Sequence, residues 1–164
     1  MNKVIAAIVV SVLVVGCATI PTTVVYRQDE GQISQTIHVL PVTDATPERH
    51  IDDVVLASLR KYLIQTLKTS GQFMSVYETM PANNQQEVTR LRCKVTQFDT
   101  SARRMAMVTE LLKGNSDRPF LRLATHTDLL SIAWPIDYVA VMERAGKSVI
   151  KDAVKQMVRS MENE

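Results

Sequence analysis

The chain has 164 residues, 22% of them charged, and a formal net charge of +2 at pH 7. Its length is sufficient for one folded domain. The near-neutral charge disfavours nucleic acid as a partner, because nucleic-acid binding requires a basic patch, and the short pair Arg103-Arg104 does not form one.

The N-terminus carries a predominantly apolar segment. Lys3 precedes the run Val4–Val15, which at about 12 residues is too short for a membrane-spanning helix of roughly 18–20. A basic start and a short apolar core are typical of a secretory signal. We therefore expect residues 1–16 to be a signal peptide. The alternatives are an uncleaved N-terminal anchor and an ordinary signal that is cut elsewhere, for example at Cys17-Ala18-Thr19.

The residues Val14-Val15-Gly16-Cys17 resemble a bacterial lipobox. In that family the cysteine receives a diacylglycerol on its sulfur, and a peptidase then cuts before it. The resemblance implies cleavage between Gly16 and Cys17, and a diacylglycerol and an N-acyl chain on Cys17 that anchor the protein to a membrane. An aspartate after the cysteine usually retains Gram-negative lipoproteins in the inner membrane. Ala18 at this position implies the outer membrane, with the protein facing the periplasm.

Cys17 and Cys93 are the two cysteines of the chain. If Cys17 carries lipid, Cys93 has no partner in the chain for a disulfide. A remaining thiol can be a buried apolar group, an intermolecular bridge or a nucleophile. Cysteine is among the most buried residue types, and no nearby motif supplies an activating base. We therefore expect Cys93 to be a buried free thiol.

Residues 17–32 are expected to form the lipidated N-terminus and a short tether, because they combine threonines, Pro21 and a polar stretch. The segment Ile33–Val42 then predicts the first strand, since its apolar residues alternate imperfectly with polar ones. Pro41 near its end is tolerated there.

A helix is predicted next. Thr46-Pro47-Glu48 is typical of a helix start, with a cap candidate, a proline in the first position and an acid in the first turn. Apolar residues then recur at helical spacing: Ile51, Val55, Leu59, Tyr62, Leu63 and Leu67. Ser70-Gly71 predicts the helix end. Phe73–Tyr77 predicts a short strand, so the order strand, helix, strand indicates a parallel pair.

Three further strands are expected. In Val88–Phe98, Leu91, Cys93 and Val95 alternate with Arg90, Arg92 and Lys94, which predicts one dry and one wet face. The segment Arg104–Leu112 suits either a strand or a helix. We favour a strand, because the turn residues Lys113–Pro119 and a second alternating stretch, Phe120–Thr127, follow it and together predict a hairpin.

The C-terminal segment, residues 139–161, predicts a helix with two faces. One face is apolar: Met142, Ala145, Val149, Ala153, Met157 and Met161. Another face carries Lys147, Lys151, Lys155 and Arg159. Leu129–Tyr138, interrupted by Pro135, predicts a packed connection. The fold class is therefore α+β: a small mixed sheet of about five strands with one crossover helix and a C-terminal helix packed on it, in a domain at residues 33–161.

This order of elements resembles small α/β domains of envelope lipoproteins, including the periplasmic domain of the curli-secretion lipoprotein. The segments that carry the resemblance are IHVLPVTD, LASLRKYLIQTLKTSGQFMSVYE, RLRCKVTQFD and the terminal helix. The resemblance implies a periplasmic domain at roughly residues 33–160. No segment suits a membrane barrel, so a secretion pore is not implied. No functional residue is carried over.

Catalytic and metal-binding patterns are absent from the sequence. His38, His50 and His126 are scattered, without the spacing of a helical metal pair. No nucleophile elbow, phosphate loop or dinucleotide fingerprint occurs. We therefore expect no metal, no cofactor other than the lipid on Cys17, and no enzymatic activity.

Two functions remain. The first is a non-enzymatic envelope lipoprotein that binds or assembles with other envelope components. The second is a carrier of a small lipid or glycan in a cleft of the domain. A large apolar pocket would favour the carrier, whereas a filled core with an exposed apolar patch would favour the partner-binding protein.

Overall fold

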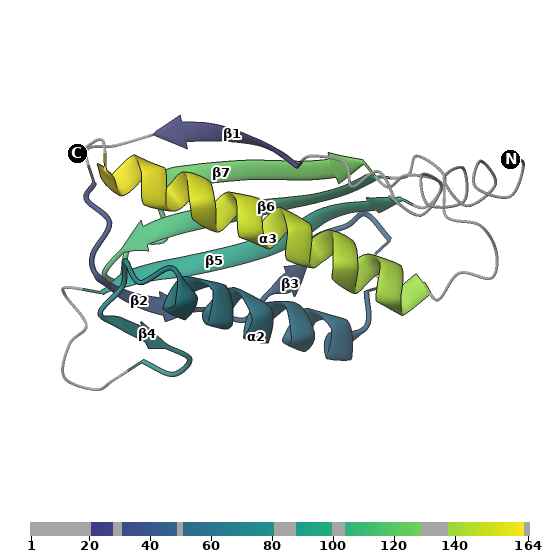
Figure 1. Cartoon of the computed structure of the whole chain (residues 1–164), viewed down its shortest axis with the longest axis horizontal. Coiled ribbons are helices and arrows are strands. Elements are labelled where there is room, and N and C mark those ends of the chain that lie inside the picture. Colours follow the sequence, from purple (N-terminus) through teal and green to yellow (C-terminus); the bar gives the residue numbers. More distant parts are fainter. Residues whose placement is uncertain are drawn as a thin grey trace, which may run out of the picture.

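A computed structural model of the chain describes residues 21–27, 31–48, 51–80, 88–99, 104–128 and 138–162. In this part of the chain, two helices cover one face of a mixed sheet (Figure 1). The predicted α+β class is confirmed. The predicted connection Leu129–Tyr138 lies outside the described residues, except for Tyr138, where the second helix begins.

The sheet has seven strands in the spatial order β1-β7-β6-β5-β2-β4, and β3 also pairs with β5. The strands are β1 (Thr22–Arg27), β2 (Thr36–Val39), β3 (Thr43–Asp44), β4 (Ser75–Tyr77), β5 (Thr89–Asp99), β6 (Arg104–Lys113) and β7 (Pro119–Asp128). Antiparallel pairing joins β5 to β6, β6 to β7 and β7 to β1, whereas β2 pairs in parallel with β4 and β5.

Strand β1 lies within the segment that was expected to be a tether. Its register runs from Thr22 opposite His126 to Arg27 opposite Leu121 of β7. Threonine, valine and tyrosine favour strands, and β1 pairs backbone groups that β7 would otherwise leave open at the sheet edge. The expectation of a tether over residues 17–32 is therefore wrong for Thr22–Arg27. The chain between Cys17 and β1 is reduced to the four residues 18–21.

The first helix, α2, spans Asp53–Thr69. The predicted start at Thr46-Pro47-Glu48 is therefore wrong. The Asp52 side chain caps α2 by accepting a hydrogen bond from the Val54 amide at 2.8 Å. The predicted end is confirmed, because Ser70 is the C-terminal cap and Gly71 follows with a φ of 70°.

A hydrogen-bonded turn occupies the predicted helix start. The Asp44 carboxylate accepts from the Thr46 amide at 2.8 Å, from the Thr46 hydroxyl at 2.6 Å and from the Ile51 amide at 2.9 Å. These bonds hold Thr46 in a buried turn and use its hydroxyl, so that it cannot cap a helix.

The predicted parallel pair is confirmed. Ile37 of β2 lies opposite Val76 of β4, and α2 forms the connection between these two strands. The predicted strand Ile33–Val42 is shorter than expected, since β2 ends at Val39 and the chain resumes pairing with β5 only at Thr43.

The predicted hairpin is also confirmed, and the segment that suited either element is the strand β6. It pairs with β5 on one side and with β7 on the other. Gly114 has a φ of 51° in the turn between β6 and β7, a conformation that glycine adopts without strain.

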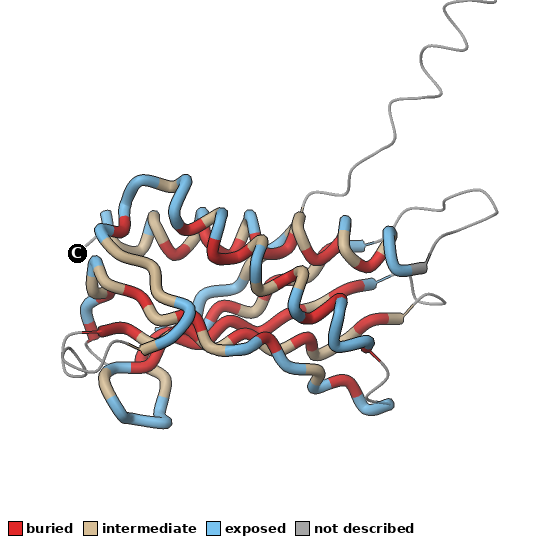
Figure 2. Tube along the Cα trace, turned by 90° about the horizontal axis from the view of Figure 1, so that it is seen from below, coloured by how far each residue is buried: buried red, intermediate tan, exposed pale blue. Residues whose placement is uncertain are grey.

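The core lies between the sheet and the two helices. Helix α3 spans Tyr138–Glu162, and its predicted apolar face is turned inward, with Met142, Ala145, Val149, Ala153 and Met157 buried. Figure 2 shows buried positions along the strands and on successive helical turns. The helices approach closely at Gly146, where a Cβ atom would lie 2.4 Å from Cδ2 of Leu59.

Candidate functional site

The predicted lipid anchor on Cys17 would join the folded domain at the start of β1. The residues predicted for cleavage, lipidation and sorting, namely Gly16, Cys17 and Ala18, lie outside the described residues. The hydroxyl of Thr23 lies 2.8 Å from the hydroxyl of Thr125 and donates to the Asp152 carboxylate of α3 at 2.5 Å. The chain therefore enters the domain beside the middle of α3.

Strand β1 also forms an exposed apolar edge. It stands at one end of the strand order, and the relative exposures of Val24, Val25 and Tyr26 are 44%, 43% and 51%. We call these three residues the β1 edge. An unpaired strand edge with apolar side chains is a surface to which another polypeptide can add a strand.

The outward face of α3 carries five cations, which we call the basic stripe: Arg144, Lys147, Lys151, Lys155 and Arg159. Their spacing of three or four residues places them on one side of the helix, opposite the buried face. Lys147 lies 3.5 Å from the Glu143 carboxylate and 5.8 Å from the Tyr62 ring centroid. Within the described part of the chain, Lys151 and Lys155 are exposed and form no ion pair.

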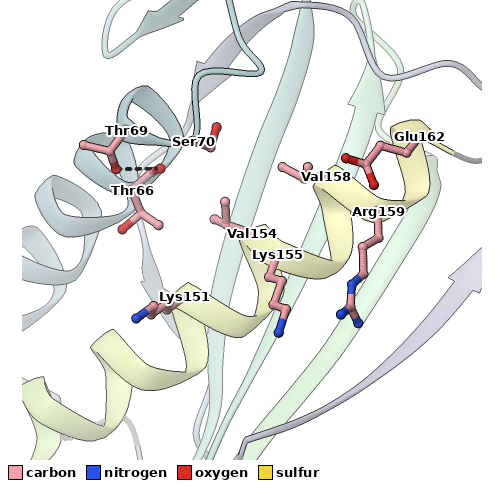
Figure 3. A pocket seen from close by; sticks show the side chains of 9 residues that line it. All are labelled: Thr66, Thr69, Ser70, Lys151, Val154, Lys155, Val158, Arg159 and Glu162. Carbon is pink, nitrogen blue, oxygen red and sulfur yellow. Dashed lines mark hydrogen bonds between the residues drawn. The ribbon is translucent and has the colours of Figure 1, made fainter.

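A groove of about 410 Å³ runs between α2 and α3. Its lining is Thr66, Thr69, Ser70, Lys151, Val154, Lys155, Val158, Arg159 and Glu162. Figure 3 shows Lys155 and Arg159 extending away from α2. Seven of the nine lining residues are polar or charged, but most of the surface that they present to the groove is apolar. The groove is open to solvent, so it does not enclose a ligand.

The face of the sheet that the helices leave open carries a charged cluster: Arg92, Lys94, Glu110 and Arg122. Nε of Arg92 donates to the Glu110 carboxylate at 2.8 Å. Nζ of Lys94 lies 3.4 Å from the same carboxylate, and Nε of Arg122 lies 4.0 Å from it. Three cations from β5 and β7 therefore converge on one buried acid of β6.

The environment of Glu110 lowers the pKa of its carboxyl group. Burial by itself would raise this pKa, but the hydrogen bond from Arg92 and the charges of Lys94 and Arg92 outweigh burial and lower it. The carboxylate is therefore ionised at neutral pH. It is occupied by structural partners, so it is not available as a proton donor.

A second group of cations surrounds His38 on β2. Its register partner is Arg90 of β5, and Nε of Arg90, Nε of Arg60 and Nδ1 of His38 are buried without a hydrogen-bond partner. Burial lowers the pKa of His38, and the Arg60 and Arg90 charges lower it further against an opposing hydrogen bond to the Glu78 backbone. His38 is therefore neutral at pH 7.

Cys93 lies on the covered face of β5 and is 1% exposed. Its Sγ atom lies 3.2 Å from the hydroxyl of Thr109. Burial raises the pKa of the Cys93 thiol to about 12, which suppresses the thiolate form that a nucleophile requires. Cys93 is therefore a structural residue of the core.

The histidines do not come together. His38 on β2 and His126 on β7 are separated in the sheet by β5 and β6, and His50 lies outside the described residues. Among the residues that the structure describes, no three histidine, cysteine or acidic side chains are grouped to hold a metal ion. No helix in this part of the chain is long and apolar enough to span a membrane.

The charged cluster was not predicted from the sequence. The alternation of Arg90, Arg92 and Lys94 indicated a wet face, but nothing in it located the acid that pairs with these cations. Glu110 within the mostly apolar stretch of β6 was the available signal, because an acid inside a buried strand requires a partner.

Comparisons with known proteins show a shared fold. No family model matches the chain, and no curated protein matches its sequence. The structure resembles the PelC dodecamer from Paraburkholderia phytofirmans, with a TM-score of 0.52 and 12% identity over 82% of this chain and 94% of PelC.

The structure also resembles a Xanthomonas campestris protein assigned to the family model DUF330. The TM-score is 0.50 and the identity 15%, over 84% of this chain and 90% of that protein. At these identities the likeness establishes a common fold and assigns no residue a role. The resemblance to the curli-secretion lipoprotein stays a prediction. The described part of the chain thus shares an architecture with PelC and with this DUF330 protein.

Proposed function

We propose that the chain is a non-enzymatic lipoprotein of the bacterial outer membrane, anchored by acyl chains on Cys17, with its domain on the periplasmic face. In this proposal the domain assembles with other components of the cell envelope. One observation carries it: the lipobox ends at Cys17, only five positions before the first strand of a folded domain begins at Thr22. A lipid on Cys17 would therefore hold the domain directly at a membrane.

The surfaces of the domain favour assembly over ligand transport. The core is filled by packed apolar side chains from the sheet and both helices. The α2–α3 groove is open to solvent, so it does not suit a carrier that must enclose a lipid or glycan. The β1 edge, in contrast, exposes three large apolar side chains in a row. The dodecameric state of PelC, which shares this fold, further supports assembly as the function.

Metabolic labelling tests the anchor. Cells that express the protein with a labelled fatty acid should incorporate the label, and Cys17→Ser should abolish incorporation. Cys93→Ser is the matched control, because it removes the other cysteine and should leave the label unchanged. Label on the Cys17→Ser variant would refute the lipid anchor.

Membrane fractionation tests the location. The protein should be recovered with outer membranes, and Ala18→Asp should move it to inner membranes, because an aspartate after the cysteine is the retention signal that the lipobox resemblance implies. Ala18→Ser is the control and should stay in the outer membrane. Unchanged fractionation of Ala18→Asp would contradict the proposed sorting.

Native mass measurement tests the assembly. The detergent-solubilised protein should form a complex larger than one chain, and Val24→Lys/Tyr26→Lys should reduce its size, because charges on an edge strand oppose further pairing. Asn115→Lys/Asp117→Lys places two lysines in the exposed β6–β7 turn and should preserve the complex. A wild-type protein of single-chain mass would refute the assembly.

A further inference from the structure

The structure points to a second contact with the membrane: we propose that the basic stripe of α3 lies against the anionic phospholipid headgroups of the membrane that holds the Cys17 anchor. This inference rests on the proposed lipid anchor and adds an orientation of the domain on the membrane surface. Neither the lipobox nor the fold likeness specifies such an orientation.

The length of the chain between anchor and domain limits the separation. Thr22 is five positions after Cys17, so even a fully extended chain spans at most about 16–18 Å between them. Helix α3 has 25 residues and is therefore about 37 Å long. The connection is shorter than the domain, so a surface beside β1 must lie close to the headgroups.

The contacts of β1 show which part of α3 is near the anchor. Thr23 donates a hydrogen bond to Asp152, which lies between Lys151 and Lys155 along α3. The anchored chain therefore leaves the domain beside the centre of the basic stripe. Asp152 is engaged with Thr23 and points toward β1, so the stripe itself is left with an excess of cations.

Charge distinguishes the stripe from the other surface beside β1. The open face of the sheet also carries cations, but Arg92, Lys94 and Arg122 converge on the Glu110 carboxylate. Lys151 and Lys155 have no such acid among the described residues. Exposed lysines close to a bilayer are attracted to anionic headgroups, with a range set by the Debye length of about 8 Å at physiological salt. The stripe is therefore the surface that an anionic bilayer attracts.

Lysine labelling of the lipidated full-length mature protein tests this orientation. The protein is reconstituted either into vesicles of phosphatidylcholine alone or into vesicles with phosphatidylglycerol added, and it is treated with a water-soluble amine reagent. Labelling of Lys151 and Lys155 should be at least about fivefold lower in the anionic vesicles. High salt should abolish this protection. Lys94, on the open face of the sheet, should label equally in both vesicles.

Two double variants provide the control. Lys151→Glu/Lys155→Glu should remove the protection, so that Lys147 of the stripe labels equally in both vesicles. Lys113→Glu/Arg118→Glu changes the net charge equally, at exposed positions flanking the β6–β7 turn, and should retain full protection of Lys151 and Lys155. Equal loss of protection in the two variants would show a general charge effect and would refute the stripe as the contact.

The outcomes separate this inference from the proposed function. The mass of the N-terminal peptide of the same sample reports the acyl chains on Cys17. If the acyl chains are absent, the proposed anchor and this inference are both wrong. If Cys17 is acylated and Lys151 and Lys155 label equally in both vesicles, the anchor stands and the orientation is wrong.

Discussion

The two cationic surfaces of the molecule differ in what their charges contact. On the open face of the sheet, Arg92, Lys94 and Arg122 surround the buried Glu110 carboxylate. On the opposite side, Lys151 and Lys155 of α3 project outward without an acidic partner among the described residues. The first set of charges contributes to the stability of the sheet, whereas the second set is available to a partner. Lysines and arginines on two surfaces of one domain can therefore have different roles.

The same contrast holds within α3. The Val149 side chain is fully buried against the core, and Lys151 two positions later is exposed. We expect Val149→Asp to cost at least about 4–5 kcal/mol and to unfold the domain, because it places an unpaired charge in the core. Lys151→Asp introduces the same side chain outside and should change the stability by less than about 0.5 kcal/mol. Circular dichroism during urea unfolding measures both, and a folded Val149→Asp would contradict the packing of α3.

Replacement of Glu110 tests how much the charged cluster stabilises the fold. Glu110→Gln should lower the free energy of unfolding by about 1–3 kcal/mol, because it leaves partly buried cations without their counter-charge. The pair Arg104 and Asp128, 2.9 Å apart, is the control, since its side chains are 47% and 55% exposed. Asp128→Asn should cost less than about 0.5 kcal/mol. Equal costs in urea unfolding would show that the charged cluster is no more stabilising than an ordinary surface pair.

The covered face of β5 provides a further contrast, since Cys93 alternates with the open-face residues Arg92 and Lys94. We expect Cys93→Ser to cost about 1–3 kcal/mol, because it introduces a more polar group into the core. A thiol reagent should label Cys93 slowly in the native protein and rapidly in denaturant. Rapid native labelling, or a disulfide-linked dimer on a non-reducing gel, would contradict its burial.

The smallest expected effect is a dependence of the unfolding free energy on pH. The pKa of Glu110 is lower in the folded protein than its ordinary value of 4.5. Its carboxylate therefore stabilises the fold above about pH 4.5, and this stabilisation is lost as the pH falls through the lower folded-state value. The difference in unfolding free energy between the wild type and Glu110→Gln should be constant near neutral pH and decrease below about pH 4.5. A difference that persists at pH 3 would indicate that charge is not its cause.

Local patterns in the sequence were sufficient for several elements. The spacing of Leu59, Leu63 and Leu67 predicted the buried face of α2, and Gly71 marked its end. The alternation around Cys93 predicted which face of β5 is buried, and the turn residues after β6 indicated that this segment is a strand. In each case the signal lies within about one element, because burial of one face imposes a period of 3.6 or 2 residues.

The sequence by itself determined the α+β class and the inward faces of both helices, because these depend on neighbouring residues. The lipobox at Cys17 is likewise a local pattern and stays a prediction. Only the tertiary structure decided that Thr22–Arg27 is a strand, since its partner β7 is about 100 residues away along the chain. The turn at Asp44 replaced the predicted helix start for a local reason, because the hydrogen bonds of the Asp44 side chain compete with the helix. The register of β5, β6 and β7 brings Glu110 to its cations, and the packing of β1 on α3 brings Thr23 to Asp152. Such pairings join distant segments, and no local period encodes them.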